Sequence, residues 1–230
     1  MTDCPCAAPP KDGSRRARTQ ARLIEAAILV LAEQGPDRTV IDDVITRAEV
    51  SRGTFYNYFR SIEEVLAAVQ QALGAEILSL VKANMQEVRD PAVRVATAVT
   101  LFTEAALHYP LFLEFTARIG HRTRGPGSVL HDAVQMLLQD GFATGRFIPM
   151  PAQMMVDVVG GSTIALLQRM QDGDRSERRH FIAALLRLLG LPAEEAWQLA
   201  EQPVPEIDLP EESLICRSEL VRTAGAGAAP

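Results

Sequence analysis

Cysteine and aromatic residues are scarce in this chain of 230 residues. Its three cysteines are Cys4, Cys6 and Cys216, and only 5% of its residues are Phe, Trp or Tyr. An odd number of cysteines, all in segments predicted to be unstructured, excludes a disulfide framework and is typical of a reducing compartment. Cys4 and Cys6 have no second cysteine pair and no histidine at a suitable spacing. We therefore expect free thiols, no metal site and no cofactor.

Long apolar runs and alternating patterns are also absent. No segment approaches the ~18 consecutive apolar residues of a membrane span, and the N-terminus has no signal-peptide core, so we expect a cytoplasmic protein without a membrane partner. No stretch alternates apolar and polar residues with a period of two. Strands are therefore not expected, and the predicted fold class is all-α.

Residue patterns typical of catalysis are missing as well. The histidines are scattered, at His108, His121, His131 and His180. No nucleophile elbow and no glycine-rich phosphate loop after a strand is present, and Gly160-Gly161 lies in an apolar segment where small residues permit close packing. We therefore do not expect an enzyme. A reaction inside a helical cavity stays open as an alternative.

What the chain does contain is apolar residues and an uneven charge. Hydrophobic residues make up 47% of the sequence, enough for a sizeable core, and the net charge is -6. Residues 1–60 contain nine Lys and Arg against eight Asp and Glu, so the other 170 residues have a net charge of -7. This asymmetry suits a protein that meets DNA with one end, although ordinary surface variation produces the same pattern.

Residues 39–59 have the pattern of two short helices joined by a tight turn. Thr39, with Asp42 three residues later, is the predicted N-cap of the first helix, and Ser51 is the predicted N-cap of the second. Helices joined so closely cross steeply, which is the helix-turn-helix arrangement. The second helix begins with Ser51–Thr54, whose backbone N–H groups and side chains suit a DNA major groove. Two aromatic residues of this helix are predicted core positions, Phe55 and Phe59.

The run from Ala48 to Phe59 resembles the DNA-binding domain of the TetR family of transcriptional regulators. The flanking Thr39-Val40 and Ser61–Leu66 extend this resemblance over roughly residues 18 to 70. It implies an all-helical homodimer with an N-terminal helix-turn-helix domain and a divergent, ligand-binding C-terminal domain. Glu49 occupies a turn position where the family usually has glycine, and Ile62 one where it usually has lysine. We expect a left-handed backbone at Glu49.

The resemblance and the side-chain chemistry together indicate which residues contact DNA. Arginine forks onto guanine O6 and N7 and threonine offers its methyl group to thymine, so Arg52 and Thr54 are predicted at base edges. The resemblance places the hydroxyls of Tyr56 and Tyr58 against the DNA backbone, with Asn57 nearby. The complete predicted set is Arg18, Thr39, Val40, Ser51, Arg52, Gly53, Thr54, Tyr56, Asn57 and Tyr58.

Helical periodicity and turn residues divide the chain into four parts. Residues 1–14 contain prolines and are predicted to be a disordered lead-in, with the first helix beginning near Thr19. Residues 15–75 form the predicted DNA-binding domain and residues 76–202 a helical ligand-binding and dimerisation domain. A long helix from Ser61 to about Asn84 connects them. Residues 203–230, which contain proline and glutamate, are predicted to be a flexible tail.

Two later helices, at residues 152–170 and 175–189, are apolar around more than half of their circumference. One packed face does not explain this distribution. We interpret these helices as halves of a four-helix bundle formed across a two-fold axis, as the resemblance also implies. Central burial within one subunit is the alternative. The predicted interface residues are Val159, Thr163, Leu166, Leu167, Ile182, Leu185, Leu186 and Leu189.

The C-terminal domain is expected to hold a small-molecule effector. The residues predicted to line its site are Phe102, Phe112, Phe115, Met136, Met154 and Met155, although methionine and aromatic residues at helical spacing are also typical of plain core. Four basic residues either meet an anionic effector or belong to a solvated loop: Arg118, His121, Arg122 and Arg124. The expected function is a repressor that releases a palindromic operator in double-stranded DNA when a largely apolar effector binds. A constitutive DNA-binding regulator without an effector is the alternative.

Overall fold

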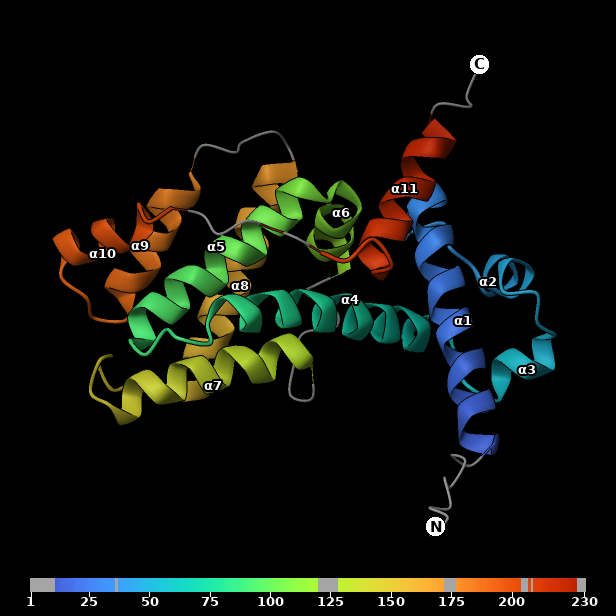
Figure 1. Cartoon of the computed structure of the whole chain (residues 1–230), viewed down its shortest axis with the longest axis horizontal. Coiled ribbons are helices and arrows are strands. Elements are labelled where there is room, and N and C mark those ends of the chain that lie inside the picture. Colours follow the sequence, from blue (N-terminus) through green and yellow to red (C-terminus); the bar gives the residue numbers. More distant parts are fainter. Residues whose placement is uncertain are drawn as a thin grey trace, which may run out of the picture. The chain divides into compact units, whose positions relative to one another are not determined.

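The computed structural model describes residues 11–35, 37–119, 128–171, 177–203, 207 and 209–226. Within these ranges all regular secondary structure is helical, which confirms the predicted all-α class. The chain divides into two compact units, Met1–Val69 and Gln70–Pro230. Helix α4 (Ile62–Asn84) carries the chain from the first unit into the second (Figure 1). The domain boundary predicted at residue 75 lies in this same helix.

The first unit consists of α1 (Lys11–Gln34), α2 (Ile41–Arg47), α3 (Arg52–Tyr56) and the beginning of α4. Its core contains apolar side chains from each helix that are at most 4% exposed: Leu23, Ile28, Val44, Phe55, Phe59 and Val65. The predicted core positions of Phe55 and Phe59 are thereby confirmed.

Helix α1 begins earlier than the sequence indicated. It starts at Lys11 rather than near Thr19, so residues 11–14 of the predicted disordered lead-in are helical. Of these four residues only Lys11 is a good helix former, so helix propensity does not account for the earlier start. The glycine among them costs only about 1 kcal/mol, which the rest of a long helix offsets.

The N-cap of α2 is Val40, so the predicted cap at Thr39 is wrong by one residue. The hydroxyl of Thr39 donates to the carbonyl oxygen of Gly35 at 3.0 Å and so closes the loop after α1. The backbone N–H of Val40 instead donates to the carboxylate of Asp43 at 3.4 Å. A carboxylate in the first turn therefore satisfies the start of this helix.

The turn between α2 and α3 is a Schellman motif with a left-handed residue. Glu49 has φ 50°, which confirms the predicted left-handed backbone. The N–H of Glu49 donates to Thr46 O at 3.2 Å and that of Val50 to Ile45 O at 3.1 Å, the two hydrogen bonds that define the motif. A guanidinium N–H of Arg22 in α1 donates to Ala48 O at 2.5 Å. The turn is therefore fixed from within and by α1.

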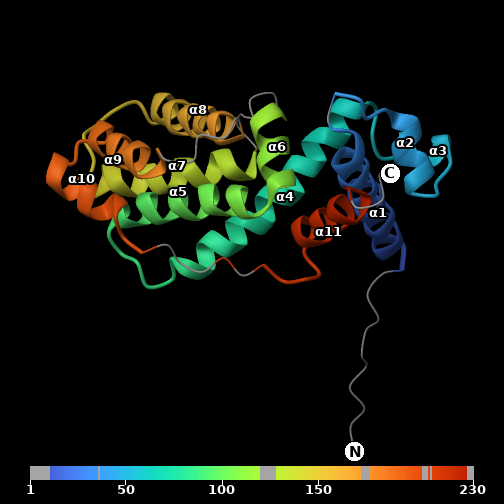
Figure 2. The same cartoon turned by 90° about the horizontal axis from the view of Figure 1, so that it is seen from above.

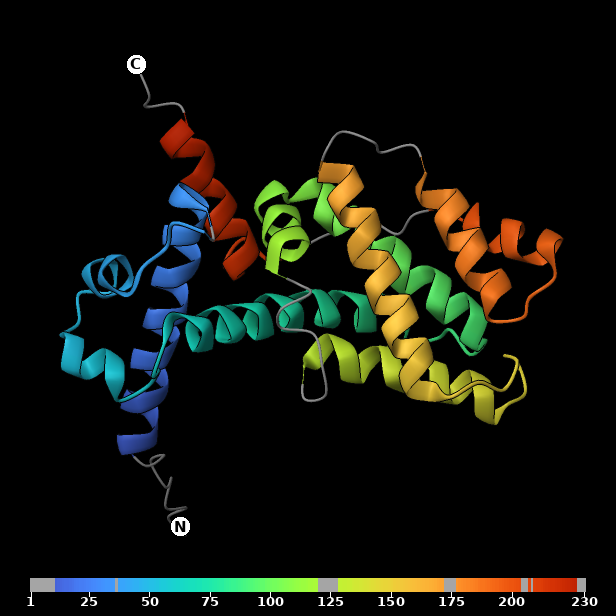
Figure 3. The ribbon, with the colours of Figure 1, turned by 180° about the vertical axis from the view of Figure 1, so that it is seen from behind.

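The second unit is a layered helical domain. Its further helices are α5 (Pro91–His108), α6 (Pro110–Ile119), α7 (Val129–Ala143), α8 (Ala152–Gln171), α9 (Arg178–Leu188), α10 (Ala193–Ala200) and α11 (Leu214–Ala226). Figure 2 shows α5 and α7 between α8 on one side and the C-terminal part of α4 on the other. Figure 3 shows α8 lying across α5 and α7, against which it packs.

Helix α5 has a capped N-terminus. Asp90 is its N-cap and accepts the N–H of Ala92 at 2.8 Å, and Pro91 occupies the first turn. Helix α4 is long and apolar enough, by length and composition alone, to cross a membrane, and among the described residues it is the one helix that is. Its Leu73 and Ile77 are at most 3% exposed, which is typical of a core helix in a folded protein.

The residues predicted to form the dimer interface, on α8 and α9, are buried within a single chain. All eight are at most 8% exposed without a partner: Val159, Thr163, Leu166, Leu167, Ile182, Leu185, Leu186 and Leu189. Helix α8 packs against α6 and α7, while α9 packs against α5 and α10, so these residues fit the alternative of central burial within one subunit. Other apolar side chains of the two helices are exposed, among them Met154, Val158 and Leu188 at 36–48%.

The tail predicted to be flexible from residue 203 contains α11. The carboxylate of Glu76 in α4 accepts the N–H groups of Leu214 and Ile215 at 2.7 and 3.0 Å. In α11, Glu219 accepts the N–H of Leu111 at the start of α6, at 3.0 Å. Carboxylates thus satisfy the free N–H groups at two helix starts, and the prediction of a flexible tail is wrong for this segment. Cys216, predicted to be in an unstructured segment, lies in this helix.

Candidate DNA-contacting surface and ligand cavity

Helix α3 presents its first turn on the surface of the first unit. Ser51 is its N-cap, as predicted, because its hydroxyl accepts the N–H of Thr54 at 3.1 Å. The hydroxyls of Ser51 and Thr54 are also within hydrogen-bond distance, at 2.9 Å. A Cβ atom built on Gly53 would meet nothing closer than the Ser51 hydroxyl at 3.9 Å, so the surface around this glycine is open.

Three side chains that follow the N-cap are exposed. The side chain of Arg52 is 60% exposed and its guanidinium lies 3.3 Å from the carboxylate of Asp42. Tyr56 is 48% exposed and packs edge-on against Phe55, with ring centroids 5.5 Å apart. Asn57 is exposed at the C-cap. The buried Phe55 thus anchors a short helix whose polar side chains face away from the core.

The other predicted DNA-contacting residues surround this helix unequally. Tyr58 is half-buried, and the guanidinium of Arg16 lies over its ring, 5.6 Å from the centroid. Arg18 is exposed on α1, and Val40 is 53% exposed at the start of α2. Thr39 is buried and its hydroxyl donates to Gly35, so its contact with DNA stays a prediction.

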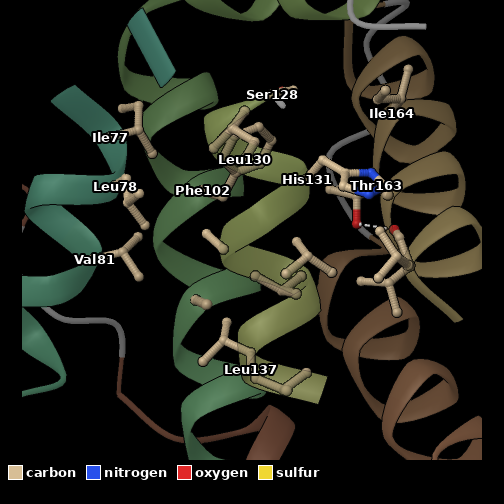
Figure 4. A pocket seen from close by; sticks show the side chains of 18 of the residues that line it. Ile77, Leu78, Val81, Phe102, Ser128, Leu130, His131, Leu137, Thr163 and Ile164 are labelled. Atoms are coloured by element: carbon tan, nitrogen blue, oxygen red, sulfur yellow. Dashed lines mark hydrogen bonds between the residues drawn. The ribbon is translucent and has the colours of Figure 1, made fainter. Parts of the chain in front are cut away.

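The second unit contains a cavity of about 130 Å³ between α4, α5, α6, α7 and α8. Most of its walls are aliphatic, with Leu78 and Val81 from α4, Val99 from α5, Leu137 from α7 and Ile164 from α8 among them. Figure 4 shows Ser128, His131 and Thr163 toward one end of the cavity and Leu137 toward the other. The polar residues that line it are Gln70, Thr116, Ser128, His131 and Thr163.

The residues predicted to line a ligand site fare differently. Phe102 lines the cavity. The ring of Phe112 packs edge-on against the ring of Phe102, with centroids 5.5 Å apart, but Phe112 does not line the cavity. Phe115 and Met155 are buried but do not line this cavity. Met136 and Met154 do not line it either and are 70% and 48% exposed. Apolar character alone did not distinguish a cavity wall from core or surface.

None of the polar residues that line the cavity was among the predicted ligand-binding residues. The Oε1 atom of Gln70 and the Nδ1 atom of His131 are buried and have no hydrogen-bond partner. Three residues of the predicted basic loop, His121, Arg122 and Arg124, lie outside the described residues, as does the side chain of Arg118. Cys4 and Cys6 lie outside them too.

Comparison with known proteins assigns both units. Residues 23–69 match the family described as bacterial regulatory proteins, tetR family, and residues 90–202 match the tetracyclin repressor-like C-terminal domain. The chain belongs to the TetR family. This confirms the resemblance drawn from residues 48–59 and extends it to the second unit. The matched regions end before α11.

Two curated relatives are named as HTH-type transcriptional regulators. The HTH-type transcriptional regulator YvdT of Bacillus subtilis (strain 168) is 33% identical over 64 residues, which is 28% of this chain and 33% of YvdT. The HTH-type transcriptional repressor DhaR of Mycobacterium sp. (strain GP1) is 31% identical over 80 residues, which is 34% of this chain and 40% of DhaR. The alignments therefore span only a third to two fifths of the length of these curated relatives.

One solved TetR-like structure is similar over both units. RolR, crystallised in complex with its ligand resorcinol, is 29% identical to this chain. The structural match has a TM-score of 0.73 and covers 85% of this chain and all of the RolR chain.

Proposed function

We propose that this chain is a homodimeric transcriptional repressor that binds a palindromic operator in double-stranded DNA and releases it when a small molecule occupies the cavity. The observation that carries the proposal is the exposed first turn of α3, with Arg52, Tyr56 and Asn57 accessible on a helix anchored by Phe55. TetR-family membership and the regulators YvdT and DhaR support it. The expected location is the cytoplasm, where the operator is.

In the proposed complex α3 enters the major groove. Arg52 reads a guanine through O6 and N7, Thr54 offers its methyl group to a thymine, and the hydroxyl of Tyr56 contacts a phosphate. The contact between Arg52 and Asp42 does not oppose this, because an exposed ion pair contributes only about 0 to 1 kcal/mol. Asp42 instead holds the guanidinium near the start of α3 until DNA is present.

The proposed dimer uses the exposed faces of α8 and α9 rather than the residues first predicted. Met154, Val158 and Leu188 are large apolar side chains that α8 and α9 leave accessible. A two-fold interface buries the same patch on both copies, so these three residues would be buried in each subunit. It would also place two copies of α3 for two operator half-sites about 34 Å apart, or a multiple of this.

The proposed effector acts through α4. This helix contributes Ile77, Leu78 and Val81 to the cavity and continues into the first unit as residues 62–69. RolR binds resorcinol, a small molecule, which supports a small effector here. By linkage, a ligand that lowers operator affinity binds the DNA-bound dimer more weakly by the same factor, typically ~5- to 150-fold.

The proposal is tested with duplexes that the purified protein selects from a randomised pool. In anisotropy titrations Arg52→Ala should weaken binding to the selected duplex by about 1 to 3 kcal/mol and change binding to a scrambled duplex much less, whereas Tyr56→Phe should weaken both evenly. If Arg52→Ala weakens binding to both duplexes equally, Arg52 contacts only phosphate and no base. Resorcinol affinity is then measured with and without saturating duplex. If every ligand that binds has equal affinities in the two states, the constitutive alternative replaces release by an effector.

A further inference from the structure

We propose that the cavity takes a neutral, single-ring aromatic molecule that carries at least one hydroxyl group, and that Gln70 and His131 recognise this hydroxyl. The inference rests on the proposed function in one respect: that binding of the molecule lowers DNA affinity. Binding itself depends only on the cavity.

The volume of the cavity limits the ligand to about one ring. An apolar cavity of about 150 Å³ in another protein holds one benzene molecule, and the cavity here has about 130 Å³. Sites for drug-sized ligands are larger, at about 300 to 1,000 Å³. The apolar side chains of Phe102, Leu137 and Val99 in the lining suit the faces of a ring. Molecules with two fused rings or a long acyl chain exceed this space.

Two polar atoms determine what the ring must carry. The Oε1 of Gln70 and the Nδ1 of His131 are fully buried without a hydrogen-bond partner, and His131 as a whole is 5% exposed. Leaving a buried polar group unsatisfied is unfavourable, so a ligand that bonds to these atoms is favoured over one that does not. An amide oxygen only accepts, whereas an imidazole nitrogen donates or accepts according to its tautomer. A hydroxyl group does both and therefore fits either partner.

A second glutamine ties together the two helix segments that carry these side chains. The side-chain oxygen of Gln71 accepts the N–H of Val129 in the first turn of α7 at 3.0 Å. Gln71 follows Gln70 on α4, and Val129 precedes His131 by two residues on α7. This bond therefore ties together the two helix segments that carry the proposed recognition pair. Rigid placement of the polar groups reduces the cost of ordering them when a ligand binds.

The charge of the lining favours a neutral ligand. Of the lining residues that the structure describes, His131 is the only one whose side chain can carry a charge. A carboxylate would lose its hydration in an apolar space without a fixed positive partner, which is costly. A phenol enters without this penalty. It also offers a hydrogen-bond partner to Gln70 and His131, whereas a hydrocarbon ring of the same size leaves both atoms without one.

The test is calorimetric titration of the full chain at pH 7 with phenol, catechol, toluene, benzoate and 2-naphthol. Phenol and catechol are expected to bind about 3- to 10-fold more tightly than toluene, the contribution of one net hydrogen bond. Benzoate and 2-naphthol are expected not to bind measurably. Equal affinities for phenol and toluene would overturn the role of the polar pair, and benzoate binding more tightly than phenol would overturn the neutral class.

Two near-isosteric variants assign the recognition to residues. Gln70→Leu and His131→Leu should each lower phenol affinity about 3- to 10-fold and leave toluene affinity unchanged or higher. The ratio of the two affinities within one variant is independent of any loss of stability. Met136→Leu, at an exposed position of the same helix as His131, is the matched control and should change neither affinity. An unchanged phenol-to-toluene ratio in both cavity variants would refute the assignment.

A cavity-filling variant separates the cavity from other binding sites. Ala98 lines the cavity, and Ala98→Leu should abolish binding of every ring probe while the melting temperature stays the same or rises. Undiminished phenol binding in Ala98→Leu would place the ligand elsewhere. Phenol binding without any change in operator affinity would overturn the proposed release but not the ligand class. Release of the operator only by compounds outside this class would overturn the ligand class and leave the proposed function standing.

Discussion

Replacing Glu49 with glycine is expected to stabilise the first unit. Glu49 has φ 50° in the Schellman turn between α2 and α3, a conformation that costs an ordinary residue about 1 to 2 kcal/mol. Glycine adopts it without this cost but is more flexible in the unfolded chain, which offsets about 0.4 to 1 kcal/mol. The midpoints of these two ranges differ by about 0.8 kcal/mol, which is the expected net gain. In a chain of this size that corresponds to roughly 1 to 4 °C in melting temperature.

Glu49→Ala is the matched control for this prediction. It removes the same exposed carboxylate but keeps a Cβ atom in the left-handed region, so it should not raise stability. Both variants remove one negative charge from the turn before α3 and should therefore change DNA affinity by the same factor. Chemical denaturation followed by circular dichroism gives the stabilities. If alanine stabilises the protein as much as glycine does, the gain comes from the lost charge and the argument from backbone strain is refuted.

The remaining predictions concern the second unit. Leu188→Glu should dissociate the proposed dimer in sedimentation without unfolding the chain, whereas Leu186→Ala, at a fully buried position, should lower the free energy of unfolding by about 2 to 5 kcal/mol. Glu76→Gln should weaken the start of α11 and speed amide hydrogen exchange of Leu214 and Ile215 about 5- to 10-fold. Burial alone would raise the pKa of Asp90, but hydrogen bonds from Arg146 and the N–H of Ala92 outweigh it and lower the pKa below its ordinary 3.8. The stability from Asp90 is therefore present above about pH 4 and lost as the pH falls through the lowered pKa; Asp90→Asn should flatten this acid limb of stability.

Local signals in the sequence were sufficient where the partners of a residue are close in the chain. Ser51 caps α3 and Asp90 caps α5, each through an N–H two or three residues away. The left-handed backbone at Glu49 follows from the tight turn in the same way. Even here one hydroxyl was misassigned, because Thr39 donates backwards to Gly35 instead of capping forwards. A short polar side chain has several backbone partners within reach, and the sequence does not rank them.

Apolar periodicity was not sufficient to say what covers an apolar face. Leu166 and Leu186 were assigned to a partner chain, yet both are buried by helices of their own chain. A helix covered on two sides within one chain has the same composition as one covered partly by a second copy. For the same reason Met136 was predicted to line the ligand site, although it is 70% exposed. Gln70 and His131, which line the cavity with buried polar atoms, were not among the predicted ligand-binding residues.

Helix α11 shows why contacts distant in sequence also matter for the cavity. Its first N–H groups bond to Glu76, the residue before Ile77 in the cavity wall, and its Glu219 bonds to the start of α6, which contributes Thr116. No periodicity relates residues more than 100 positions apart, so a proline-rich connection made this segment resemble a tail. Because α11 joins α4 to α6, it braces two walls of the proposed ligand site. Loosening α11 should therefore change ligand affinity as well as stability, even though none of its residues lines the cavity.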